Sequence, residues 1–228
     1  MAVFNPWHRK LRVPGSNRIP GCVIAPTRAK GTASSWAPWE TSPRKDGRNC
    51  PGTTDETRAV AAIFPQAVSA SEGEFTHDRA IAALREFDIV HFATHGVLDE
   101  RTPLFSALLT SSAAGQPTRL SLFELPEIHI AARMIVLSAC ETGLGRMGGG
   151  DEISSLGRTF LMAGAATVVS SLWKVSDEST SLLMQEFYRG LAARLSPARA
   201  MRAAMIDVRK KYPHPFYWAP FQVTGAAE

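Results

Sequence analysis

A histidine and a cysteine each come directly after a short apolar segment of this 228-residue chain. His95 follows the segment at residues 88–94, and Cys140 follows the segment at residues 133–139. A thiol is a weak nucleophile until it loses its proton, and a neighbouring imidazole can accept that proton. Glycines follow both residues, so backbone amides can approach a substrate carbonyl there. The pattern predicts a nucleophilic cysteine with a histidine base, although a single cysteine at a strand end is more often a buried apolar residue.

The two apolar segments are short and rich in β-branched residues, which is typical of buried strands. A further buried strand is predicted at 167–172, a shorter strand at 104–110, and an edge strand at 221–224. Helices are predicted after a Thr76 cap and at 152–162, 177–193 and 197–211. Strands that alternate with helices indicate an α/β sandwich with a mostly parallel sheet. Because ligands bind beyond the carboxyl ends of such strands, we expect His95 and Cys140 at one edge.

Residues 1–50 differ in composition from the rest of the chain. They contain nine Lys or Arg, two acids and six prolines, whereas residues 51–228 contain 16 basic and 19 acidic residues. We predict a basic, Pro-rich leader at 1–50 that is mostly disordered and adds little to the fold, followed by one folded domain at 51–228. Three tryptophans in the leader leave docking onto the domain open. Nucleic acid is expected to interact only weakly, through this leader.

Several classes of protein are excluded by composition and motifs. The chain is 45% hydrophobic, yet its longest apolar-leaning run, 160–173, is too short and too polar to span a bilayer. No secretory signal is visible and three cysteines make no disulfide framework, so we expect a cytoplasmic protein without a membrane partner. The sequence contains no HExxH, CxxC, P-loop or GxSxG motif, so zinc binding, nucleotide hydrolysis and serine-hydrolase chemistry lack support, and no metal or cofactor is expected. Gly143, Gly145 and Gly148 match a dinucleotide motif, but they start too far from the strand end.

Longer strings occur in a fixed order along the chain: VHFATHG, PLFSALL, VLSACETGLG, GDEISSLGRTFLMAGAATVVSSLWKVSDEST and FYWAPFQVTG. An apolar block ending in His-Gly, followed by one ending in Ala-Cys, resembles the caspase-like cysteine peptidases. The full strings resemble the CHAT domain, a separase-related caspase-like domain often found behind tetratricopeptide repeats. The resemblance covers about three quarters of the chain, from residue 51 to residue 225. It implies a caspase-like three-layer α/β sandwich, with His95 as general base and Cys140 as nucleophile.

The function implied is that of a cysteine endopeptidase, a thiol protease performing site-restricted hydrolysis of protein or peptide substrates. In this mechanism the amides of Gly96 and Cys140 would stabilise the oxyanion. The alternative is a non-catalytic caspase-like interaction module in a signalling complex. The resemblance also implies a repeat-containing protein as a regulatory partner. Residues 1–50 themselves do not resemble the helical repeats that usually precede this domain.

Candidate substrate-binding residues follow the strands that end before Cys140 and at residue 172. Asp151 and Glu152 open a helix, where carboxylates also simply favour the N-terminus, and Trp173 and Asp177 follow the next strand. The charged residues of these loops are Glu141, Arg146, Asp151, Glu152, Lys174, Asp177 and Glu178. Five acids against two bases predict cleavage after Arg or Lys, or after a neutral residue if Lys174 turns inward, and not after Asp. Inside the first strand, His91 is expected to be a packed, hydrogen-bonded residue.

Overall fold

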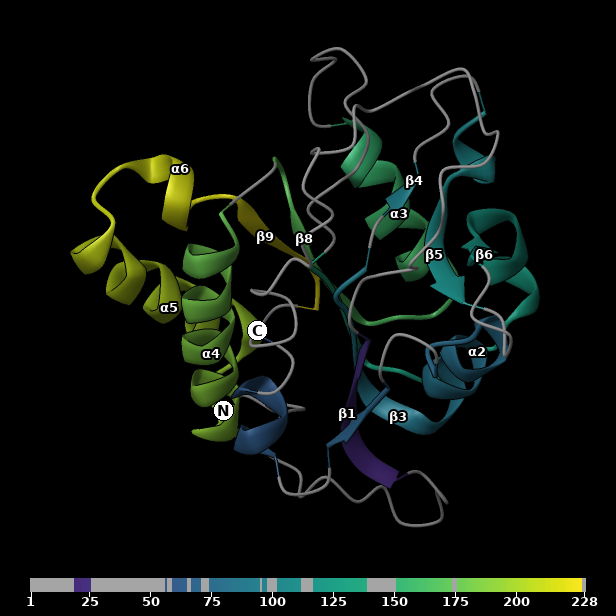
Figure 1. Ribbon diagram of the computed structural model, residues 1–228, viewed down its shortest axis with the longest axis horizontal. Helices are drawn as coiled ribbons and strands as arrows, with labels where there is room; N and C mark the ends of the chain where they lie inside the picture. The colour runs from purple at the N-terminus through teal and green to yellow at the C-terminus, as the bar shows by residue number, and fades with distance from the viewer. Residues whose placement is uncertain are drawn as a thin grey trace, which may run out of the picture.

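The computed structural model describes residues 19–25, 56, 59–64, 67–70, 74–94, 96–97, 102–111, 117–138, 151–173 and 176–226. Within these residues a six-stranded sheet forms the centre of the molecule (Figure 1). Its strands are β1 (Ile19–Ala25), β2 (Val68–Ser69), β3 (Phe87–Phe92), β7 (Met134–Leu137), β8 (Thr167–Ser171) and β9 (Phe221–Gly225). The spatial order is β2-β1-β3-β7-β8-β9, and all neighbouring pairs are parallel except β8 and β9. The predicted mostly parallel sheet is therefore confirmed.

The central strands are apolar on both faces because helices cover both sides of the sheet. Side chains alternate along a strand, so Phe92 of β3 and Leu137 of β7 enter one core, while Val136 of β7 enters the other. A strand buried on both faces reads as a continuous apolar run, which is why β3, β7 and β8 are recognisable in the sequence.

Two layers of helices complete the sandwich (Figure 1). The first core contains residues of α2 (His77–Glu86) and α3 (Asp151–Met162). The second core contains residues of α4 (Asp177–Ala192) and α5 (Pro197–Lys211), together with Val60 from the helical residues 59–63. The short helix α6 (Pro215–Trp218) leads into β9. Helix, sheet and helix thus form the three layers that the sequence predicts.

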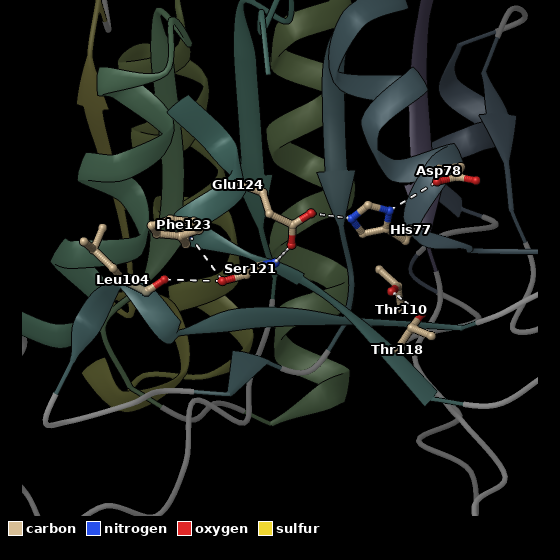
Figure 2. Close-up of polar contacts among 8 residues, drawn as sticks. All are labelled: His77, Asp78, Leu104, Thr110, Thr118, Ser121, Phe123 and Glu124. Carbon is tan, nitrogen blue, oxygen red and sulfur yellow. Dashed lines mark hydrogen bonds and ion pairs between the residues drawn. The ribbon is translucent and has the colours of Figure 1, made fainter. Parts of the chain in front are cut away.

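A small antiparallel sheet lies beside α2 and α3 (Figure 1) and differs from the prediction. It consists of β4 (Gly96–Val97), β5 (Ala107–Ser111) and β6 (Pro117–Ser121). The predicted strand at 104–110 was wrong at its start, because Pro103–Phe105 forms a short 3-10 turn, and β6 was not predicted. Directly opposite residues Thr110 and Thr118 share a hydrogen bond of 2.8 Å between their hydroxyls (Figure 2).

A capping box starts the 3-10 helix Leu122–Glu127 that follows β6 (Figure 2). The Ser121 backbone N–H donates to Glu124 Oε1 at 2.9 Å, and the Ser121 hydroxyl accepts from the Phe123 N–H. The other Glu124 oxygen lies 2.7 Å from His77 Nε2 at the start of α2. Burial alone would lower the pKa of His77, but hydrogen bonds and charges of Glu124 and Asp78 raise it above its ordinary value of 6.5.

Strand β1 corrects the prediction for the leader. It lies within residues 1–50, yet it pairs in parallel with β2 on one side and β3 on the other. The prediction that this leader is disordered and adds little to the fold is therefore wrong for Ile19–Ala25. The remainder of 1–50 lies outside the described residues, so there the prediction is untested. No helix in the described parts of the chain is both long and apolar enough to cross a membrane.

Candidate functional site

The two predicted catalytic residues follow neighbouring strands of the sheet. β3 and β7 pair in parallel, and their last residues, Phe92 and Leu137, are register partners. The pairing continues by one residue, because the Ser138 N–H donates to the Phe92 carbonyl at 3.0 Å. His95 and Cys140 lie outside the described residues, so their mutual geometry stays a prediction. Each of them, however, comes three residues after its register-paired strand end.

Both residues next to His95 in the sequence are held by β5. The Thr94 hydroxyl donates to the Leu109 carbonyl at 2.7 Å, and Gly96 is the register partner of Leu108. Thr94 and Gly96 are both buried. The chain therefore leaves the main sheet after β3 and joins the small sheet at a fixed point. The oxyanion role predicted for the amides of Gly96 and Cys140 stays a prediction.

A buried polar cluster lies on the α4 face of the sheet, immediately before these strand ends. The Ser138 hydroxyl donates to Glu56 Oε1 at 2.9 Å, and His91 Nε2 lies 3.3 Å from the same oxygen. On the other side of its ring, His91 Nδ1 lies 3.0 Å from the Tyr188 hydroxyl of α4. The His91 and Tyr188 rings are stacked with centroids 5.7 Å apart. The prediction that His91 is packed and hydrogen-bonded is confirmed.

The other three members of this cluster were not identified from the sequence. Glu56 is only 4% exposed, Ser138 is 7% exposed, and Tyr188 is fully buried. The only local signal was the position of Ser138 at the end of an apolar strand, two residues before Cys140. Glu56 and Tyr188 lie 82 residues before Ser138 and 97 residues after His91 respectively, so no spacing rule connects them.

The predicted substrate-binding residues lie where α3 and α4 begin. Asp151 and Glu152 are the first two residues of α3, and Asp177 is the first residue of α4. The side chains of Asp151, Glu152 and Asp177 lie outside what the structure describes. Trp173 is partly buried, and its indole Nε1–H donates to the Phe216 carbonyl at 3.1 Å. This contact gives Trp173 a structural role in holding α6, and substrate binding by all four residues stays a prediction.

In the parts of the chain that the structure describes, no group of three or more His, Cys, Asp or Glu side chains could hold a metal ion.

An ion pair on the surface joins the two helices α4 and α5. At the start of α4, Glu178 accepts from Lys211 of α5 at 3.0 Å. The neighbouring Tyr212 hydroxyl and the Lys211 ammonium lower the pKa of Glu178.

Two solved structures with a similar fold are of cysteine proteinases. Gingipain R, an Arg specific cysteine proteinase, superposes with a TM-score of 0.56 at 13% identity, covering 91% of this chain and 46% of that chain. The complex of the pro- and mature domains of the Porphyromonas gingivalis gingipain gives a TM-score of 0.53 at 12% identity, covering 91% of this chain and 47% of that one. At this level of identity the likeness shows the fold, which is that of caspase-like cysteine proteinases.

Two relatives in sequence are named as tetratricopeptide repeat proteins. Tetratricopeptide repeat protein 28 of Mus musculus is 25% identical over 190 residues, and its Homo sapiens counterpart is 24% identical over 190 residues. Each alignment covers 66% of this chain but only 8% of the relative, so the chain spans a small part of their length. A family model of the CHAT domain matches residues 29–226, starting inside the predicted leader. The chain therefore belongs to the CHAT domain family.

Proposed function

We propose that this chain is a caspase-like cysteine endopeptidase that cleaves protein or peptide substrates at restricted sites, with Cys140 as nucleophile and His95 as general base. The proposal rests on one observation: β3 and β7 are parallel neighbours whose last residues are register partners. The same three-residue spacing then separates each strand end from its predicted catalytic residue. Membership of the CHAT family and the caspase-like fold support the same reaction class.

The proposed reaction proceeds by acyl transfer. His95 takes the proton of the Cys140 thiol, and the thiolate attacks the scissile carbonyl carbon to form a tetrahedral oxyanion. The amides of Gly96 and Cys140 stabilise that oxyanion, and His95 protonates the departing amine as the C–N bond breaks. Water, deprotonated by His95, then hydrolyses the thioester and restores the thiol. The nucleophile, the base and the two oxyanion-binding amides all belong to this chain.

A basic residue is proposed before the scissile bond. The segments after β7 and β8, up to the first turns of α3 and α4, contain five acids against two bases, and of these acids Glu178 is paired with Lys211. Burying an acidic substrate side chain beside like charges that lack a partner costs several kcal/mol, or on the order of a thousandfold in rate. A fluorogenic library with every residue at that position tests this, with the Cys140→Ala variant as background. Efficient cleavage after Asp would refute the preference.

The catalytic proposal is tested by labelling with an electrophilic peptide and by cleavage assays on the full chain. Cys140 should react with one equivalent of label far faster than Cys22 or Cys50, and Cys140→Ala and His95→Ala should abolish cleavage. Cys50→Ala serves as the matched control and should keep wild-type cleavage. Equal labelling of the three cysteines, or cleavage that survives Cys140→Ala, would refute the proposal.

A second candidate function is a non-catalytic interaction module in a signalling complex. It is favoured by one observation: the name of the curated relatives refers to tetratricopeptide repeats and to no reaction. In either case a repeat-containing protein is a proposed regulatory partner, and a cytoplasmic location is proposed from the cysteine usage of the sequence. Under this second candidate, the labelling experiment would find Cys140 no more reactive than the other cysteines.

A further inference from the structure

One carboxylate oxygen joins the two strands that lead to the proposed catalytic residues. Glu56 Oε1 accepts the hydrogen bond of Ser138, which follows β7, and faces His91 of β3 at 3.3 Å. Ser138 is two residues before Cys140, and His91 is four residues before His95. Glu56 itself belongs to neither strand. It therefore provides a side-chain link between β3 and β7 in addition to their backbone ladder.

The hydrogen positions in this cluster follow from its geometry. Ser138 is a donor to Glu56, so the shared oxygen acts as acceptor. An N–H on His91 Nε2 is the favourable tautomer opposite that oxygen, and Nδ1 then accepts the Tyr188 O–H. With this tautomer the Tyr188 O–H donates to His91, the Ser138 O–H donates to Glu56, and the His91 Nε2–H faces the same Glu56 oxygen. Buried chains of this kind strengthen and orient their members.

The cluster is not explained by stability alone. Its members are nearly or fully buried, and His91 Nε2 is not aligned for a full hydrogen bond to Glu56 despite the short distance. Burying a carboxylate and an imidazole without complete hydrogen bonding costs free energy, and apolar residues of similar volume often stabilise a core at least as well. A cluster that is costly for the fold and adjacent to the strand ends fits a role in holding the site in place.

We infer that Glu56 is a positioning residue of the proposed peptidase: it holds Ser138, and through it the start of the Cys140 loop, against β3. This inference rests on the proposed function. Removing the acceptor leaves the Ser138 hydroxyl and His91 without their common partner, so the residues that precede Cys140 and His95 lose the side-chain link between them. The change should slow the chemical step more than it weakens substrate binding, because a small displacement of nucleophile and base acts on the transition state.

The test uses four variants of the full chain. Glu56→Ala removes the acceptor, Ser138→Ala removes the donor, the double variant removes both, and Glu56→Gln restores an acceptor oxygen of the same reach. Glu186→Gln on the surface of α4, where Glu186 pairs with Arg189, is the matched control for the carboxylate-to-amide change. Folded fraction is measured by circular dichroism, and kcat, KM and the iodoacetamide alkylation rate of Cys140 are measured below the unfolding transition.

We expect Glu56→Ala and Ser138→Ala each to lower kcat and Cys140 alkylation by about tenfold, with KM changed less than about twofold. The double variant should lose no more than either single variant, since both remove the same link. Glu56→Gln should recover most of the rate, and Glu186→Gln should match wild type. If Glu56→Ala does not fold, Ser138→Ala and Glu56→Gln carry the test.

Folded variants with wild-type kcat and alkylation would overturn the inference. So would additive losses in the double variant, or a Glu56→Gln variant as slow as Glu56→Ala. These results differ from a failure of the proposed function, which is read in the wild-type chain as equal alkylation of Cys140, Cys22 and Cys50.

Discussion

The close packing of α4 against α5 depends on a glycine. Gly190 lies in the last turn of α4, and a Cβ atom added there would lie 2.9 Å from the Ala200 Cβ and 3.1 Å from the Ala200 Cα of α5. The first distance is shorter than real Cβ atoms show, and the second contact is to backbone, which cannot rotate away. A Gly190→Ala substitution therefore requires the two helices to move apart.

Two opposing effects determine the stability of this variant. Alanine is favoured over glycine within a helix by at most about 1 kcal/mol, and less in a last turn. Overpacking of a well-packed interface costs about 1–3 kcal/mol, and here the upper part of that range applies because the helix backbone must shift. We expect Gly190→Ala to lower the free energy of unfolding by about 1–3 kcal/mol, which corresponds to a fall in Tm of about 2–12 °C for a chain of this size.

Urea unfolding followed by circular dichroism measures this change, provided that the m-value is unchanged. Gly157→Ala in α3 is the matched control, because the new methyl group would lie at an ordinary 3.4 Å from Val168 Cγ1, and its stability should equal or exceed that of wild type. Adding Ala200→Gly to Gly190→Ala should cost less than the two single changes together. The reasoning is refuted if Gly190→Ala is as stable as wild type, or if the two positions show no coupling.

Three further predictions concern β1, the α2 start and the buried cluster. Deleting residues 1–25 should lower the urea midpoint strongly compared with deleting residues 1–17, because β3 would lose its ladder neighbour; equal midpoints would contradict this. Because its pKa is raised, His77 should stabilise the fold fully below pH 6.5 and lose that contribution as pH rises through the folded-state pKa. The difference in unfolding free energy between wild type and His77→Gln should thus shrink between about pH 5.5 and about pH 8.5, which lie roughly one unit below and two units above the ordinary histidine pKa. A difference that stays constant over this range would contradict the prediction. Tyr188→Phe should lower the free energy of unfolding by about 1–3 kcal/mol, because His91 Nδ1 loses its hydrogen-bond partner while the aromatic ring at position 188 stays packed. An unchanged urea midpoint would show that the Tyr188 hydroxyl contributes nothing to stability.

Elements with a strong local signal were predictable from the sequence. The apolar runs of β3, β7 and β8 and the periodic patterns of α3, α4 and α5 all appear near their predicted bounds. Thr76 caps α2 by accepting the Arg79 N–H, and Pro197 opens α5 after Ser196. These features depend on side chains within one or two turns or on strand burial, so neighbouring residues contain the necessary information.

Elements that depend on distant partners were not predictable. β1 is a short segment in a basic, Pro-rich region, and it becomes a strand because β2 and β3 provide hydrogen-bonding partners on both sides. The strand β6 likewise exists through its register with β5, a pairing that is stabilised by cross-strand contacts and not by the propensity of its own residues.

For the candidate site, the sequence alone determined the residue types: a histidine and a cysteine after two apolar strands, with Gly96 directly after the histidine and Gly143 three residues after the cysteine. Only the tertiary structure decided that those strands are register-paired neighbours, and that Glu56, His91, Ser138 and Tyr188 meet beside their ends. The physical reason is burial. A polar side chain enters a core only where partners from other elements satisfy it, and those partners are chosen by the packing of the whole chain rather than by any local pattern.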